Sequence, residues 1–428
     1  MGKQTSPPSA EKSSPPPAGE KDSSPPADEK MAQAEKNPPA VEKEPPAPAV
    51  DKKSSASAVE ENPLPSEKSL VTSPAVEKDE SLAPEQDSSS PLKKDSPPPP
   101  IPDQSYKKKL GYHHYSYASS FGGSGMGRGS FDHPVAIAVD SQDNVYVVDQ
   151  GNNLIQKFTQ NGGFICEWGK RGSNLGEFDS PSAIAIYMDK RDNAYVYVVD
   201  TNNNRIQRFN PAKFNPSYKP EADPNYPNLF TVLGSLGSGK GKFQKPTDIV
   251  VDDDHTIYIV DSGNSRIQKL KFDRDGNPEL KDRDGNPEWK EFGSYGSCRE
   301  CFLAPSKIAY DPTGFGYLYV LDQNRKNFLL QKIDTSGRFL RTLDVFNSKE
   351  NPISKPSHIY FDADGFLYVV DQEKGSVAKF NADGEFIQNI GDPSSPSLSK
   401  PQSIVQDSDK RLLILDSGSN RVKIFDQM

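Results

Sequence analysis

The sequence predicts an all-β fold: a six-bladed β-propeller, closed by an N-terminal strand and preceded by a disordered, proline-rich tail. Three observations lead to this fold class. Residues 1–104 contain 22 of the 39 prolines, and every Phe, Tyr and Trp lies after them. From residue 131 onward, one unit of β-strand patterns occurs six times. The last copy lacks its final strand, and an unmatched strand precedes the first copy.

The N-terminal region, residues 1–105, is predicted to be a disordered tail, and residues 106–428 to be the propeller. The tail repeats a Pro/Ser/Ala/Glu/Lys theme with few large apolar side chains, so it buries too little surface to offset the entropy of ordering. We expect a solvated spacer, with a ligand for proline-reading domains around Pro97–Pro100 as the alternative. The N-terminal stretch has no apolar segment typical of a signal peptide, which favours the cytoplasm over secretion and leaves localisation otherwise open.

Each copy of the repeat has a proline before its first β run and an aspartate at the end of its second. The prolines are Pro134, Pro181, Pro246, Pro305, Pro356 and Pro401. The aspartates are Asp149, Asp200, Asp261, Asp322, Asp371 and Asp416. Runs such as VYVVD and IYIVD are β-branched and aromatic, which is typical of short strands. Four such strands in about 45 residues correspond to one propeller blade.

The two ends of the repeat region predict how the ring closes. The segment Tyr115–Gly122 has an aromatic residue just before glycine and a glycine-rich exit, as does the fourth strand of the first copy, Phe164–Gly169. The sixth copy ends at Met428, after its third strand. We therefore expect the N-terminal strand to complete the last blade, which removes two sheet edges that would invite aggregation.

The repeated pattern resembles the NHL repeat. The match is most specific in the stretches Asp200-Thr-Asn-Asn-Asn-Arg205 and Asp261-Ser-Gly-Asn-Ser-Arg266, whereas the fourth copy has Phe328 in place of the arginine and the fifth has no arginine there. The resemblance implies a six-bladed propeller that acts most often as a binding platform. NHL relatives include RNA or protein binders linked to ubiquitin ligases, sensor domains of bacterial kinases, and peptidyl-amide lyases.

Strand alternation predicts which side chains of the first strands share one orientation toward the central channel. The residues are Ala136, Ala183, Asp248, Lys307, His358 and Ser403. Asp248, Lys307 and His358 would form a mixed-charge channel mouth and a candidate binding site. The alternative is that these three side chains are solvated or hydrogen-bonded to neighbouring blades.

The loops after the second strands form the other candidate surface. Their candidate binding residues are Arg205, Arg266, Arg421, Asn204 and Asn264, on the face that holds the anchor prolines. The six aspartates themselves are predicted to be structural, because a single active site needs no sixfold copy. They would bond the polar loops, with the arginine of some copies as partner.

Cys298 and Cys301 form a C-x-x-C pair in a loop between blades. A structural zinc site usually needs two further ligands, and no second pair accompanies them. The cysteines are a candidate redox pair, with a local reversible disulfide, a metal role and incidental cysteines all left open.

The sequence favours a non-catalytic platform that binds a protein or peptide through these loops. We predict no catalytic residues, no metal and no cofactor, and a monomeric chain. The alternatives are a metal-dependent enzyme of the propeller channel, similar to lyases or lactonases, and a propeller that binds RNA or glycans.

Residues 105–428 hold 39 Lys and Arg against 41 Asp and Glu, which argues against nucleic-acid binding through bulk charge. No apolar run is long enough to span a membrane.

Overall fold

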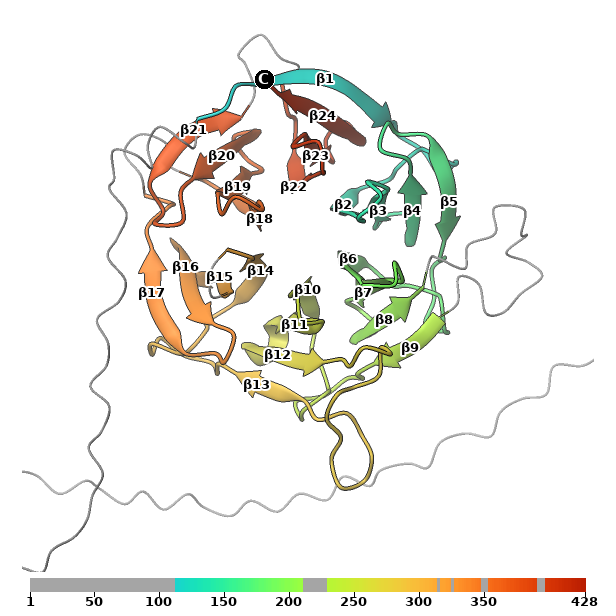
Figure 1. Ribbon diagram of the computed structural model, residues 1–428, viewed down its shortest axis with the longest axis vertical. Coiled ribbons are helices and arrows are strands. Elements are labelled where there is room, and N and C mark those ends of the chain that lie inside the picture. Colours follow the sequence, from blue (N-terminus) through green and yellow to red (C-terminus); the bar gives the residue numbers. More distant parts are fainter. Residues whose placement is uncertain (1–111, 211–228, 314–315, 325–326, 348–352, 391–396) are drawn as a thin grey trace, which may run out of the picture. The chain divides into compact units, whose positions relative to one another are not determined.

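The computed structural model describes residues 112–210, 229–313, 316–324, 327–347, 353–390 and 397–428. The predicted tail and its boundary at residue 105 lie outside the described residues. Within these ranges, no helix is long and apolar enough to cross a membrane. The described chain folds into six four-stranded antiparallel sheets arranged around one axis (Figure 1).

Each sheet is one blade, and its strands run from the axis to the circumference in the order a, b, c, d. The a strands are β2 (Pro134–Val139), β6 (Pro181–Met188), β10 (Pro246–Val251), β14 (Pro305–Asp311), β18 (Pro356–Phe361) and β22 (Pro401–Gln406). The b strands are β3 (Val145–Asp149), β7 (Ala194–Asp200), β11 (Thr256–Asp261), β15 (Tyr317–Asn324), β19 (Leu367–Asp371) and β23 (Leu412–Asp416).

The c strands are β4 (Leu154–Phe158), β8 (Arg205–Phe209), β12 (Arg266–Lys271), β16 (Asn327–Asp334), β20 (Ser376–Phe380) and β24 (Arg421–Gln427). The d strands are β5 (Phe164–Trp168), β9 (Leu229–Leu233), β13 (Lys290–Phe292), β17 (Phe339–Leu343), β21 (Phe386–Ile390) and β1 (Tyr115–Gly122). A short 3₁₀ helix, η3 (Ser262–Asn264), follows β11. Blade 1 begins with β2, and the remaining blades follow in chain order to blade 6, which begins with β22.

The ring closes as the sequence predicts. β1 pairs antiparallel with β24, from Tyr115 opposite Gln427 to Gly122 opposite Arg421. In Figure 1, β1 lies along the outer side of β24. Blade 6 is therefore built from both ends of the propeller, and its sheet has the same four strands as the others.

The hydrophobic core lies at the seams between neighbouring blades. Six clusters of buried side chains occur, one at each seam, including the seam that joins blade 6 to blade 1. The b strands are buried on both faces, because they lie inside a blade and between two neighbouring blades. This explains why runs such as VYVVD show almost no polar alternation.

Candidate functional site

The two ends of the blades make two faces of the ring. We call the first the loop face: it holds the b–c loops and the d–a loops that lead into each anchor proline. Four d–a loops share one length and a glycine-rich pattern, namely residues 122–131, 169–178, 234–243 and 293–302. In each, the third residue forms a parallel bridge with the aromatic residue at the end. The opposite end, with the a–b and c–d hairpins, is the turn face.

The six repeated aspartates are all buried beneath the loop face, with at most 2% of each exposed. Each carboxylate accepts the backbone N–H of the residue two positions before the anchor proline of its own blade. Examples are Asp132 to Asp149 at 2.9 Å and Gln244 to Asp261 at 2.8 Å. These carboxylates join the b strand to the entry of the a strand, which is a structural role.

Two of the predicted binding residues, Arg205 and Arg266, lie below the loop face and are buried. The Arg205 side chain donates to Asp200 at 2.7 Å, and its terminal nitrogens donate to backbone carbonyls of the loop 169–178. Arg266 does the same with Asp261 and the loop 234–243. The geometry supports anchoring of these loops rather than direct display to a partner.

The other three predicted loop residues differ in their surroundings. Asn264 donates to the Gly237 carbonyl at 3.0 Å and so also anchors a d–a loop. Asn204 accepts the Lys245 N–H at 2.8 Å and links blade 2 to blade 3. Arg421 is exposed, since Asp416 opposite it pairs with Lys423 at 2.7 Å instead. Their contact with a partner stays a prediction.

The d–a loops display large apolar side chains that the sequence reasoning did not single out. Met126, Leu175, Leu236 and Tyr295 are between 67% and 86% exposed. The four loops together carry six Lys or Arg and two Glu, although the globular part is nearly neutral overall. These four loops are therefore locally basic and display apolar side chains. The sequence did contain a signal for their exposure, because an isolated apolar residue in a glycine-rich loop has no strand to pack against.

The central channel brings together the predicted residues of the a strands. A cavity of about 260 Å³ is lined by Ala136, Ala183, Asp248, Lys307, His358 and Ser403, among others. Asp248 accepts the Ile308 N–H at 2.9 Å, and the His358 ring nitrogen Nδ1 accepts the Ile404 N–H at 3.4 Å. Both bonds reach the following blade, as the structural alternative anticipated.

In this channel, burial and the charge of Lys307 determine the pKa shifts of Asp248 and His358. Burial raises the pKa of Asp248, while the Lys307 charge opposes that shift. Burial and the same Lys307 charge lower the pKa of His358 to about 3, so this imidazole is neutral near pH 7. A ligand role for Asp248, Lys307 and His358 stays a prediction.

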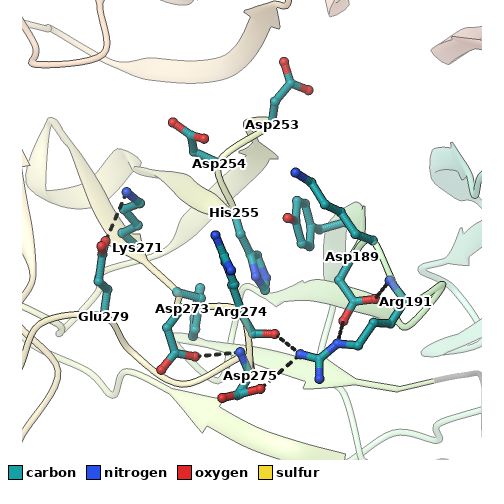
Figure 2. A pocket seen from close by; sticks show the side chains of 13 residues that line it. Asp189, Arg191, Asp253, Asp254, His255, Lys271, Asp273, Arg274, Asp275 and Glu279 are labelled. Carbon is teal, nitrogen blue, oxygen red and sulfur yellow. Dashed lines mark hydrogen bonds and ion pairs between the residues drawn. The ribbon is translucent and has the colours of Figure 1, made fainter.

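A larger groove lies on the turn face, between blades 2 and 3. Its volume is about 860 Å³, within the range of ligand sites in proteins. Figure 2 shows its walls: the a–b hairpin around Asp189, the a–b hairpin around His255, and the c–d hairpin from Lys271 to Glu279. Arg191 reaches across from blade 2 and pairs with Asp275 of blade 3 at 3.0 Å.

The floor of this groove departs from the repeat. In blades 1, 3 and 5 the b-strand tyrosine donates to an aspartate of its own a–b hairpin, as Tyr258 does to Asp252 at 2.9 Å. In blade 2, Tyr197 instead contacts His255 Nε2 of blade 3 at 2.7 Å. The His255 ring stacks on Tyr187, with centroids 3.8 Å apart. Burial, assisted by the charge of Arg208, lowers the pKa of His255 to about 4.

Sequence reasoning missed this groove, although one of its walls was visible as an insertion. The third copy contains a tandem RDGNPE sequence, which forms two successive hairpin turns. Asp273 and Asp282 each accept backbone N–H groups within their own turn. The seam with blade 2 depends on hairpin lengths, which the repeat pattern does not specify.

Cys298 and Cys301 are joined by a disulfide, with their Cα atoms 4.9 Å apart. The pair belongs to the d–a loop 293–302 and therefore to the loop face. Among the described residues, no group of three or more His, Cys, Asp or Glu side chains is placed to hold a metal ion.

A family model for the NHL repeat matches residues 131–158 and 243–270, which are the first and third copies. The chain therefore carries NHL repeats in a six-bladed propeller. It is 24% identical over 178 residues to Protein brain tumor of Drosophila melanogaster, covering 42% of this chain and 14% of that protein. It is 22% identical over 328 residues to the human E3 ubiquitin-protein ligase TRIM32, covering 72% and 44%.

The NHL propeller thus spans less than half the length of each of these curated relatives. Among solved structures, it is similar to a gluconolactonase from Xanthomonas campestris at 14% identity and a TM-score of 0.47. That alignment covers 70% of this chain and 87% of the other.

Proposed function

We propose that this NHL propeller is a non-catalytic platform that binds a protein or peptide segment on its loop face. The observation that carries the proposal is the display of Met126, Leu175, Leu236 and Tyr295 on d–a loops of successive blades. Buried side chains such as Arg205 and Arg266 fix two of these loops from below. Rigid, exposed apolar anchors bury area on binding at a small entropic cost.

The charge of the loops narrows the chemistry of the partner. Six cationic side chains against two carboxylates favour an acidic segment, and the apolar tips favour large apolar side chains within it. The same charge would also attract a phosphate backbone, which makes RNA the second candidate. Three of the four exposed side chains, Met126, Leu175 and Leu236, are not aromatic and offer bases no stacking surface, which favours a peptide.

The enzyme alternative, a lyase- or lactonase-like reaction in the channel, has weaker support. Asp248 and His358 are engaged with the backbone of neighbouring blades, and Lys307 is the remaining charged group of the channel set. Metal analysis of the purified full chain tests this alternative. Tightly bound metal at one equivalent per chain would overturn the non-catalytic assignment.

Selection of a displayed random-peptide library on the full chain tests the proposed surface. We expect enrichment of acidic sequences with large apolar residues. The variant Leu175→Asp/Tyr295→Asp should bind selected peptides more than tenfold more weakly, because both changes oppose apolar and acidic contact. Asp254→Ala/Arg274→Ala, in the groove of the turn face, is the matched control and should bind as the native chain does.

Two results would contradict the proposal. One is loss of peptide binding in the groove variant with full retention in the loop variant. The other is binding of single-stranded RNA in the absence of any peptide enrichment. Circular dichroism of each variant checks that the ring has folded.

A further inference from the structure

The four glycine-rich d–a loops share one backbone conformation. In each, the N–H of the ninth residue donates to the carbonyl of the sixth: Ser130 to Gly127 at 2.9 Å in the first loop and Cys301 to Cys298 at 3.1 Å in the fourth. The fourth loop, residues 293–302, differs in having a disulfide across this turn. The shared conformation provides three internal controls for the effect of that bond.

The loops differ in the side chains that anchor them. The second and third loops are held by Arg205 and Arg266, which pair with Asp200 and Asp261 and also donate to loop carbonyls. In blade 4, the register places Leu329 opposite Asp322, at the position of these arginines. This corrects the sequence alignment, which had placed Phe328 there.

The fourth loop therefore lacks the guanidinium anchor from its c strand. Of the described residues of blade 4, Gln331 supplies the side-chain hydrogen bond to this loop, from Nε2 to the Cys301 carbonyl at 3.1 Å. The first loop also lacks the arginine, since Leu154 lies opposite Asp149, and Gln156 holds it by hydrogen bonds to Gly129 and Ser130. The disulfide therefore occurs in one of the two loops that have no arginine. The disulfide joins the sixth and ninth residues, across the same turn whose carbonyls accept hydrogen bonds from the arginines in the second and third loops.

We propose that the Cys298–Cys301 disulfide replaces the arginine anchor and is a thiol–disulfide exchange site, so that a dithiol reductant releases this loop alone. Cys298 is exposed and Cys301 is buried, so the reductant's thiolate attacks the sulfur of Cys298. The disulfide bond breaks, and Cys301 leaves as a thiolate that takes up a proton. The second thiol of the reductant then displaces Cys298, which also becomes a thiol, and the reductant becomes a disulfide. Two electrons pass from the reductant to the cysteine pair.

The inference rests on loop geometry and does not depend on the proposed partner. This loop carries the exposed Tyr295, however, so the redox state of the pair would control one of the four glycine-rich loops of the loop face. The other three loops have no cysteine and would not respond.

Hydrogen exchange of the full chain, measured with and without dithiothreitol, tests the proposal. Reduction should speed exchange in residues 293–302 on the order of tenfold, with no change in residues 234–243, which Arg266 anchors. Cys298→Ser/Cys301→Ser should reproduce the reduced pattern without reductant. After reduction, iodoacetamide should label Cys298 in the folded protein, whereas the buried Cys166 should stay unlabelled.

The variant Leu329→Arg provides a rescue, since it returns an arginine to the position opposite Asp322. Exchange of its loop 293–302 should then be slow in both redox states. Three results would overturn the proposal: equal exchange before and after reduction, faster exchange throughout the ring on reduction, or cysteines that remain free thiols in the presence of glutathione disulfide. If Leu329→Arg fails to fold, the serine variant and native labelling still decide the outcome.

Discussion

Blades 3 and 4 are neighbours built from one repeat, yet side chains hold them together in different ways. In blade 3, Asp261 pairs with Arg266 under the loop face, and Tyr258 donates to Asp252 under the turn face. In blade 4, Asp322 faces Leu329, and the buried Tyr319 hydroxyl has no hydrogen-bond partner among the described residues. The backbone register of the b strands is nevertheless the same.

The comparison separates the features that all copies of the repeat share from the features that vary between blades. Strand pairing and the aspartate that binds the loop entry are common to both blades, so they specify the fold. The arginine, the tyrosine bond and the disulfide vary from blade to blade, so they tune individual loops. We therefore expect functional differences around the ring to come from these variable side chains.

The largest predicted difference between the two blades concerns their buried aspartates. Asp261→Ala removes the acceptor from Arg266, Asn264 and Gln268 and should lower the free energy of unfolding by about 4 kcal/mol. Asp322→Ala leaves two backbone N–H groups unpaired and should lower it by about 2 kcal/mol. Urea unfolding measures both values. Equal losses would mean that the arginine adds nothing to blade 3.

The second predicted difference is a dependence on pH that belongs to blade 3. Burial and Arg208 hold the pKa of His255 at about 4 in the folded chain, against 6.5 ordinarily. Below pH 6.5 the unfolded chain therefore binds a proton that the folded chain rejects, so stability falls as the pH drops from 6.5 toward 4. The loss from pH 7 to pH 5 should be about 2 kcal/mol.

The variant His255→Gln tests the assignment of this pH effect. Its urea-unfolding free energy should lose about 2 kcal/mol less than that of the native chain over the same pH interval. His358 contributes in the same direction in both proteins, since its pKa is also lowered, to about 3. Parallel pH profiles for the two proteins would refute the assignment. The corresponding a–b turn of blade 4 contains no histidine.

The smallest predicted difference concerns the two tyrosine hydroxyls. Tyr258→Phe removes a buried hydrogen bond of 2.9 Å to Asp252, and should cost about 1 kcal/mol. Tyr319→Phe removes a hydroxyl that has no partner in the described part of the chain, and should be neutral or slightly stabilising. Both side chains are almost fully buried, so each variant is the control for the other. A clear loss of stability in Tyr319→Phe would reveal a partner for its hydroxyl.

The fold could be predicted from the sequence because its determinants repeat. Six anchor prolines and six aspartates give the number of blades, and the unmatched strand Tyr115–Gly122 gives the closure. Strand alternation also gave the lining of the channel, since Asp248, Lys307 and His358 follow directly from the register. The burial of Arg205 and Arg266 could have been inferred from their fixed spacing to Asp200 and Asp261.

The surfaces could be predicted only in part, because they depend on what does not repeat. The groove around His255 requires the extended hairpin of blade 2 and the insertion of blade 3 to meet across a seam. The apolar tips of the d–a loops occupy different positions within otherwise equivalent loops, as Leu175 and Leu236 do. The repeat pattern describes only the positions that the copies share, so it does not identify these residues. Their exposure follows only from the loop conformation.

The most direct test of the account is a hydrogen-exchange footprint of the full chain with a selected peptide bound. The loop face is predicted to gain protection, concentrated in residues 169–178, 234–243 and 293–302, with the turn face unchanged. Protection confined to residues 187–193 and 253–279 would place the binding site in the groove and contradict the account.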